Sequence, residues 1–163
     1  MSRRHRLCTD INFIHEVLHS AEIIFMSFNR NNEAPYIIPF NFVFVESKNC
    51  IYVHTGLEGT KQDLIKINNN VGFSTVSYSE VCPEKTTSYY SSVCGIATAK
   101  IIYDNDEKIF AFDLFDEKYN AACKLHKREV DLNRCMIIRF DISSLCGKRH
   151  LKDMPDMPGI KNM

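Results

Sequence analysis

The sequence contains no tryptophan, no cysteine pair spaced Cys-x-x-Cys, no internal repeat and no low-complexity tract. Its apolar runs are far shorter than the roughly 20 residues of a membrane-spanning helix. Seven cysteines, an odd number without zinc-ribbon spacing, argue against a disulfide scaffold or a structural zinc site. Net charge is also absent, because 20 Lys and Arg residues balance 20 Asp and Glu residues. These absences disfavour a membrane span and a main role in binding nucleic acid.

The remaining features are those of one folded, water-soluble domain. The chain has 163 residues, of which 45% are hydrophobic and 25% charged. Its basic N-terminus, Arg3 to Arg6, leads into polar residues rather than an apolar signal core, so we expect a cytoplasmic protein. We expect one domain over residues 1–150, followed by a tail over residues 151–163 with the composition of a linker.

Hydrophobic patterning predicts a mainly β fold with peripheral helices. Strands are expected at residues 23–28, 36–45, 50–54, 71–79, 88–102 and 136–142, and helices at residues 10–21, 60–67 and 106–122. Asp10 is a suitable N-cap for the first helix. Because most connections are short, the six strands favour an antiparallel barrel or sandwich.

The expected strand at residues 36–45 is apolar on both faces. One face carries Ile37, Val43 and Val45, and the other carries Tyr36, Ile38, Phe40, Phe42 and Phe44. An antiparallel sheet normally leaves one face to solvent, so a packed element, a partner subunit or a flat apolar ligand must cover the second face. Pro39 lacks a ladder donor and favours an edge strand with a bulge.

The segment from Gly56 to Lys61 runs from a strand through two glycines into a helix. A helix start offers unpaired N–H groups and a positive dipole end, Thr60 adds a hydroxyl donor, and Lys61 adds a compact charge. These groups suit a phosphate, although the spacing is not that of a Walker loop. An ordinary helix N-terminus is the alternative interpretation.

Residues 15–19, His-Glu-Val-Leu-His, match the zincin pattern in which two histidines bind zinc and the glutamate acts as a base. A match this short arises by chance, and no third ligand follows at a family spacing. Both histidines also lie beside the apolar stripe of the helix. We therefore favour a solvated helix flank and expect no metal site.

Five motifs in order resemble the nitroimidazole-resistance (Nim) branch of the pyridoxamine 5'-phosphate oxidase-like flavoproteins. They are Arg3-Arg4-His5-Arg6, Pro35-Tyr36-Ile37-Ile38-Pro39-Phe40-Asn41-Phe42, Ile51-Tyr52-Val53-His54-Thr55, Gly59-Thr60-Lys61-Gln62-Asp63-Leu64 and Tyr90-Ser91-Ser92-Val93-Cys94-Gly95-Ile96-Ala97. The resemblance covers about residues 3 to 145. It implies a six-stranded antiparallel Greek-key split β-barrel that forms a homodimer, with FMN, or FAD as an alternative, held between the subunits.

The resemblance also implies roles for particular residues. The ring would lie against Pro39, Phe40, Asn41 and Phe42, the ribityl chain and phosphate near Thr55, Thr60 and Lys61, and Ser92 would reach the cofactor across the dimer. His54 matches a histidine proposed to act near the flavin and is the candidate catalytic residue. A hydrogen-bonded histidine at a strand end is the structural alternative for His54.

These features together lead us to expect an FMN-dependent oxidoreductase of the nitroimidazole-resistance type. It would pass electrons from NAD(P)H or another reductant through flavin to a small acceptor such as a nitroaromatic. The alternative is a non-catalytic flavin- or haem-binding protein in which His54 is an axial ligand. Ser91 stands where many relatives have arginine, and the Arg-rich C-terminal segment of true pyridoxamine phosphate oxidases is missing, so vitamin B6 oxidation is disfavoured.

Overall fold

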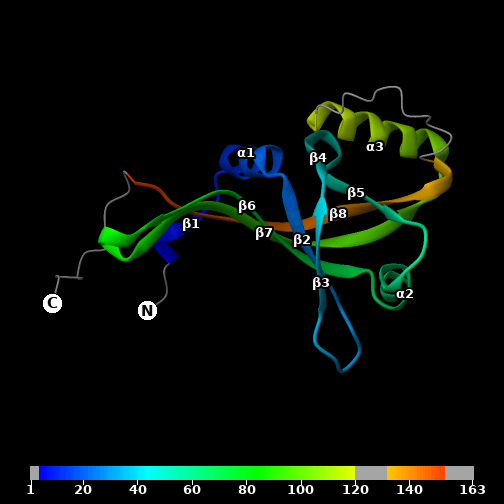
Figure 1. Cartoon of the computed structure of the whole chain (residues 1–163), viewed down its shortest axis with the longest axis horizontal. Helices are drawn as coiled ribbons and strands as arrows, with labels where there is room; N and C mark the ends of the chain where they lie inside the picture. Colours follow the sequence, from blue (N-terminus) through cyan, green and yellow to red (C-terminus); the bar gives the residue numbers. More distant parts are fainter. Residues whose placement is uncertain (1–3, 120–131, 153–163) are drawn as a thin grey trace.

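The structure is a computed structural model that describes residues 4–119 and 132–152. The helices are α1 (Ile11–Ser20), α2 (Thr60–Ile67) and α3 (Asn105–Lys118), and short 3-10 turns are η1 (Arg4–Arg6), η2 (Glu46–Lys48) and η3 (Pro83–Lys85). The strands are β1 (Leu7–Cys8), β2 (Ile23–Phe28), β3 (Tyr36–Asn41), β4 (Val43–Val45), β5 (Cys50–Gly56), β6 (Asn70–Cys82), β7 (Thr87–Ile102) and β8 (Cys135–His150). Figure 1 shows their arrangement.

A single antiparallel sheet contains all of these strands in the order β3-β2-β6-β7-β8-β5-β4, and β1 pairs with β8. The two edges of this path, β3 and β4, are consecutive in the chain, with only Phe42 between them. The sheet must therefore curl until its edges meet at Phe42, but no ladder joins them. The fold is a split barrel. The prediction of a mainly β fold with peripheral helices is confirmed.

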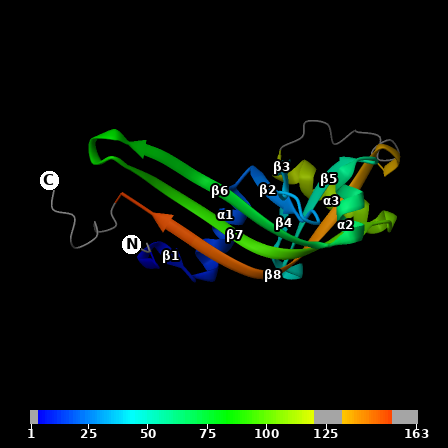
Figure 2. The same cartoon turned by 90° about the horizontal axis from the view of Figure 1, so that it is seen from below.

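Long strands carry the sheet beyond the barrel. Strands β6, β7 and β8 are 13, 16 and 16 residues long, and their outer halves run side by side as an arm, with η3 at its tip and η1 and β1 alongside (Figure 2). We call this part the arm. The segment after residue 142 pairs with β7 as far as His150. The last strand is therefore longer than the predicted 136–142, because the apolar alternation ends at Ile142 while the pairing continues.

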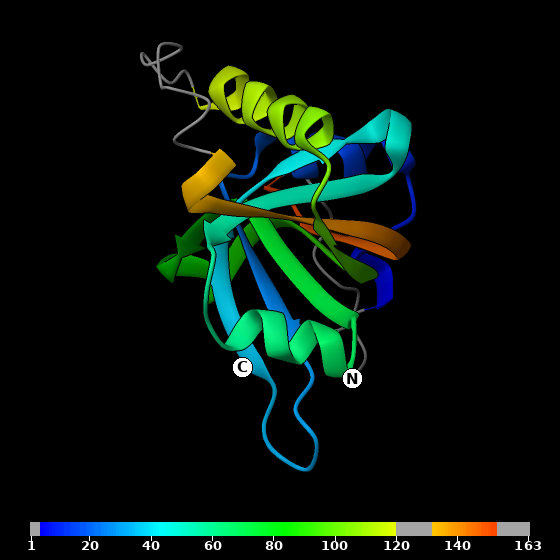
Figure 3. The same cartoon turned by 90° about the vertical axis from the view of Figure 1, so that its right-hand side faces the viewer.

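Two apolar clusters follow from the alternation of side chains along the strands. Inside the curl, α1 and α2 contribute buried residues such as Leu18 and Leu64, which pack with residues of β2, β5 and β8. On the outer face, α3 lays Phe112 and Phe115 over β4 and β5, where they cover Val43. Figure 3 shows α3 and α2 on opposite sides of the curled sheet.

The second cluster partly explains why residues 36–45 are apolar on both faces. Phe40, Phe42 and Phe44 lie in the inner core, and α3 covers the outward Val43 and Val45. The predicted single strand is divided at Phe42, because the Tyr119 hydroxyl accepts the Phe42 N–H at 3.0 Å and also lies 3.0 Å from the Phe42 carbonyl oxygen. One side chain from the end of α3 thus replaces the missing ladder bonds at this corner.

Most predicted elements are confirmed. Helix α2 has the predicted bounds, and Asp10 caps α1 by accepting the Asn12 N–H at 3.0 Å. The predicted helix 106–122 begins at Asn105, but its last residues lie outside the described part of the chain. The predicted tail over 151–163 is described only as far as residue 152, so the domain boundary stays a prediction. None of the described helices is both long and apolar enough to cross a membrane.

Lys118 gives the fold a pH-dependent element. Its Nζ donates to the Ala21 carbonyl at 2.7 Å and lies 3.9 Å from the centre of the Phe42 ring. Burial lowers the pKa of Lys118 from 10.5 to about 8, although the nearby Glu22 carboxylate opposes the shift. Below pH 8 the folded protein must hold a partly desolvated charge, and between pH 8 and 10.5 the unfolded chain binds more protons than the folded one.

We therefore expect the wild type to gain stability relative to Lys118→Met as pH rises from 8 to 10.5. The gain should be about 1 kcal/mol, since solvent screens this partly exposed amine. Urea unfolding of both proteins at several pH values measures the difference in their free energies of unfolding. The contributions of other titrating groups cancel in this difference. The matched variant Lys66→Met removes an exposed lysine and should give no such trend. A flat difference for Lys118→Met would contradict the assignment.

Candidate functional site

The split in the barrel exposes two backbone edges. Strand β4 pairs with β5 only from Val43 opposite Tyr52 to Val45 opposite Cys50, while β5 continues to Gly56 with β8 on its other side. Strand β3 pairs only with β2. Among the described residues, the outer edges of β3 and of residues 53–56 therefore have no strand partner. We call this pair of edges the barrel split, and it offers N–H and C=O groups to a ligand.

Helix α2 begins directly after the barrel split. Gly59 is its N-cap, with φ 131°, a conformation that favours glycine, and no side chain caps the first turn. A Cβ at Gly56 or Gly59 would meet no atom within 4 Å, so the space around this turn is open. The N–H groups ahead of Gln62, the exposed Thr60 hydroxyl and the half-buried Lys61 are thus available to an anion, and binding of a phosphate here stays a prediction.

The predicted residues of β3 face in two directions. Pro39 and Asn41 are exposed on the outer face of the sheet, whereas Phe40 and Phe42 are buried in the inner core. The Phe42 backbone is engaged by Tyr119, so the ligand-accessible backbone of this segment is that of residues 36–41. The side chains of Phe40 and Phe42 pack in the inner core and hold this segment in place, so they do not face a ligand on the outer surface.

His54 and Thr55 lie near the end of β5 on opposite faces. His54 is on the outer face with Tyr52, and its ring centre is 4.8 Å from that of Phe115 in a perpendicular contact. Thr55 is half-buried on the inner face and lies opposite Met136. Strands β3, with Asn41, and β5, with His54, approach each other across the barrel split. The structure therefore brings these predicted residues to one corner.

Ser92 lies elsewhere in the same chain. It belongs to the arm, where it pairs with Val76 and Lys148 and donates through Oγ to the Lys148 carbonyl at 3.2 Å. Ten residues of β7, about 33 Å of extended strand, separate it from Ile102, which lies near the start of α2. One copy of the chain does not assemble Ser92 with Lys61.

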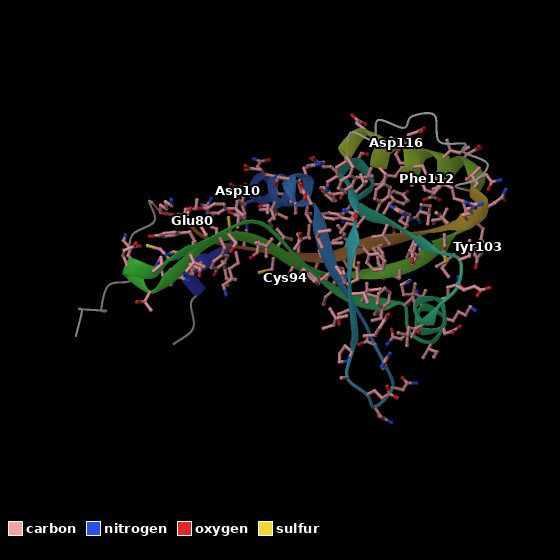
Figure 4. The ribbon with its side chains drawn as sticks, viewed as in Figure 1. Asp10, Glu80, Cys94, Tyr103, Phe112 and Asp116 are labelled. Carbon is pink, nitrogen blue, oxygen red and sulfur yellow. The ribbon has the colours of Figure 1, made fainter. Side chains whose placement is uncertain are left out.

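An exposed apolar surface covers the outer face of β3, β2, β6 and β7. It consists of Ile23, Phe25, Ile37, Val76 and Ile96, which are 39–60% exposed. The register joins them, since Ile37, Ser27, Gly72 and Ile96 form one row and Pro39, Phe25, Ser74 and Cys94 the next. Figure 4 shows Cys94 on the side of the arm opposite α1. We call these five residues the apolar face, and a patch of this kind marks an interaction surface.

A cleft of about 210 Å³ borders the turn before α2. Its lining includes Leu57 of that turn, Gln62 of α2, Tyr103 and Lys108 near the start of α3, and Met136 of β8. The Gln62 side chain donates to the Leu57 carbonyl and holds the turn in place. The cleft thus combines apolar walls with a lysine and a tyrosine near the barrel split, as small-molecule sites do.

An ion-pair network beneath α3 was not foreseen from the sequence. Glu107 accepts from Tyr52 Oη at 2.7 Å and from Arg139 Nη1 at 2.6 Å, and Asp141 pairs with Arg139 at 2.8 Å and with Lys100 at 2.7 Å. Burial and the Glu107 carboxylate raise the pKa of Tyr52 far above its ordinary value, so its hydroxyl stays a donor. The network fixes α3, and with it the wall behind His54, on β5 and β8.

The zincin-like residues are engaged by one carboxylate. His15 Nδ1 lies 3.1 Å and His19 Nε2 3.7 Å from the Glu46 carboxylate, and both rings pack against Phe44 at 5.2 Å. In the described parts of the chain, no group of three or more His, Cys, Asp or Glu residues has a geometry that could hold a metal ion. The contacts with Glu46 join α1 to η2.

The chain is similar in sequence and in fold to known proteins. The family model described as pyridoxamine 5'-phosphate oxidase matches residues 10–149. No curated protein sequence matches the chain. A candidate 5-nitroimidazole antibiotic resistance protein from Bacteroides thetaiotaomicron has a similar structure, with a TM-score of 0.75 and 20% identity over 87% of this chain and 85% of that one.

Two further structures share the fold. The flavocytochrome Anf3 from Azotobacter vinelandii has a TM-score of 0.75 and 14% identity, covering 97% of this chain and 76% of its own. The FAD and heme binding protein from Mycobacterium smegmatis has a TM-score of 0.75 and 15% identity, covering 93% and 76%. Identities this low establish the shared fold alone. The family model, by contrast, spans most of the sequence and includes both edges of the barrel split, so the chain belongs to the pyridoxamine 5'-phosphate oxidase family.

Proposed function

We propose that the protein binds FMN at the barrel split and serves as a flavin-dependent oxidoreductase. The observation that carries the proposal is the juxtaposition of two unpaired backbone edges with an uncapped helix start bearing Thr60 and Lys61. A flavin needs hydrogen-bonding groups along its polar ring edge and a cationic or N–H-rich site for its phosphate. The described residues offer both within one corner of the fold.

Each residue would have a definite task. The N–H groups at the start of α2, the Thr60 hydroxyl and Lys61 would hold the phosphate, with Thr55 beside the ribityl chain. The free edge of β3 at Pro39 and Asn41 would hydrogen-bond the ring, and the buried Phe40 and Phe42 keep that edge rigid. The bound flavin would supply the electron transfer, while the chain binds it, orients it and excludes water. His54, at the corner with Asn41, is the candidate for positioning or protonating the acceptor.

A homodimer would complete this site. The apolar face exposes five large apolar side chains and lies on the same outer surface as Pro39, Asn41 and Ser92. Ser92 lies too far along β7 to reach the phosphate site of its own chain, but a second copy packed on the apolar face could bring its Ser92 to the flavin. The fold likeness to the Bacteroides protein supports a nitroimidazole or another small nitroaromatic as acceptor, and NAD(P)H is the donor that we propose.

A second candidate is a non-catalytic flavin or haem carrier. Two structures with the same fold are a flavocytochrome and an FAD and heme binding protein, and FAD could replace FMN in this site. His54 is exposed at the end of β5 and stands against the aromatic ring of Phe115. An imidazole in such a position can serve as an axial haem ligand.

The absorption spectrum of the freshly purified protein separates the candidates. We expect flavin bands that bleach when NAD(P)H is added without oxygen and return when a nitroimidazole is added. His54→Ala should keep the flavin bands but slow the return by at least about tenfold, the usual loss for a proton-transfer group. A Soret band that disappears in His54→Ala would favour the haem carrier. Colourless protein that binds neither FMN nor haem would refute both.

A further inference from the structure

Arg6 is a buried cation in η1, which lies alongside the arm. Its side chain is only 8% exposed, although arginine is normally a surface residue. Its Nη2 lies 3.4 Å from His150 Nε2, and its Nε has no hydrogen-bond partner in the described parts of the chain. Among those residues, no carboxylate forms an ion pair with Arg6. A buried guanidinium without a counter-ion is costly, so the arrangement implies a missing anion.

His150 does not supply the missing charge. Its Nδ1 lies 2.8 Å from the Ser88 carbonyl oxygen, which can only accept, so Nδ1 carries the proton. In this tautomer Nε2 is the acceptor for Arg6 Nη2. The nearest hairpin carboxylates are engaged elsewhere, Glu80 with Lys152 and Tyr78, and Glu84 with the Cys82 thiol.

Arg6 lines an open cavity of about 420 Å³ between η1 and the β6–β7 hairpin. The rest of the lining is rich in hydroxyl groups: it comprises Thr86, Thr87, Ser88 and Tyr90 with Val81, Cys82 and Pro83. A planar guanidinium with several hydroxyl donors is the donor set that proteins use for phosphate. The volume exceeds that of a phosphate ion and suits a phosphorylated small molecule.

We propose that this cavity is a phosphate-binding site in which the Arg6 guanidinium is the anchor and the hydroxyls of Thr86 and of β7 are additional donors. The ligand class is a phosphate monoester. The proposal is independent of the flavin site, because the β6–β7 hairpin that lines the cavity is at the far end of the arm from α2 in the same chain (Figures 1 and 2). The phosphate could come from a free metabolite or from the flavin bound by a second copy.

Inorganic phosphate is the first probe, titrated into the full chain at constant ionic strength and followed by thermal unfolding and by amide NMR shifts. We expect saturable stabilisation of the wild type, with shifts at residues 86–90. Arg6→Gln should weaken phosphate binding by about 10- to 100-fold, the usual worth of a charge-assisted contact, and Arg6→Lys should retain part of it. Arg149→Gln, a charge-matched control on the same arm whose guanidinium packs on Phe13, should bind as the wild type does.

Two further experiments identify the source of the phosphate. If phosphate binds equally well before and after saturation with FMN, the site serves a free phosphate monoester. If FMN competes with phosphate through Arg6 and riboflavin does not, the flavin phosphate of a neighbouring copy is the ligand. Equal phosphate affinity in the wild type and Arg6→Gln would overturn the proposal. So would tighter binding by Asp153→Asn/Asp156→Asn, because the chain's own tail would then be the anion.

Discussion

Replacing Lys61 with alanine is expected to weaken FMN binding by about 1 to 3 kcal/mol, an increase in Kd of roughly 5- to 150-fold. The ε-ammonium group of Lys61 would neutralise the flavin phosphate at the start of α2, where no side chain caps the first turn. Flavin fluorescence quenching on titration with apoprotein measures the Kd.

Two controls make the Lys61 result specific. Lys66→Ala removes a lysine from the last turn of the same helix, where it pairs with Asp63 at 3.8 Å, and should leave the Kd unchanged. Riboflavin lacks the phosphate, so Lys61→Ala should not change its affinity. If both variants weakened FMN equally, or if riboflavin lost as much as FMN, the phosphate would be placed wrongly.

Phe25→Asp is expected to turn the proposed dimer into monomers and to abolish tight flavin binding. Phe25 lies at the centre of the apolar face and is 50% exposed in the single chain. An aspartate there would be buried without a partner in a self-complementary interface. Because the dimer is symmetric, both subunits would bring this charge into the interface. Central interface residues commonly contribute 2 kcal/mol or more, so we expect the dimer Kd to rise by about 100-fold or beyond. Sedimentation equilibrium measures it.

The matched control for Phe25→Asp is Ile11→Asp. Ile11 is also 50% exposed and apolar, but it lies at the start of α1, away from the apolar face, where an acidic residue suits the helix dipole. This variant should remain dimeric and keep flavin. Circular dichroism should show both variants folded. Monomeric wild-type protein, or Phe25→Asp protein that stays dimeric, would contradict the proposed assembly.

Local sequence signals were sufficient for most of the fold. The helix at residues 60–67 has its predicted bounds, since Gly59 and the apolar spacing mark both ends. Asp10 likewise marks the start of α1. The last strand was predicted too short, because Ser143 to His150 do not alternate and are held in the sheet by pairing with β7. Register with a distant strand, rather than local pattern, decides such segments.

The candidate site was predictable in its chemistry but not in its assembly. The helix start that suits a phosphate and the strand interrupted at Pro39 can both be recognised from the order of residues in the sequence. The division at Phe42 depends on Tyr119. Arg6 acquires its cavity from a hairpin about 80 residues later and a hydrogen-bond partner in His150. Neither pairing leaves a periodic trace in the sequence, so only the three-dimensional structure reveals them.

The Tyr119 hydrogen bonds have a consequence for biosynthesis. Phe42 and Tyr119 are 77 residues apart, so at about 5 to 20 residues per second the ribosome needs roughly 4 to 15 s to supply the second partner after the first. Until then the corner between β3 and β4 has no side chain to bond its backbone, and the nascent sheet is open to wrong pairing. The N-terminal third of the protein therefore matures only after α3 has emerged.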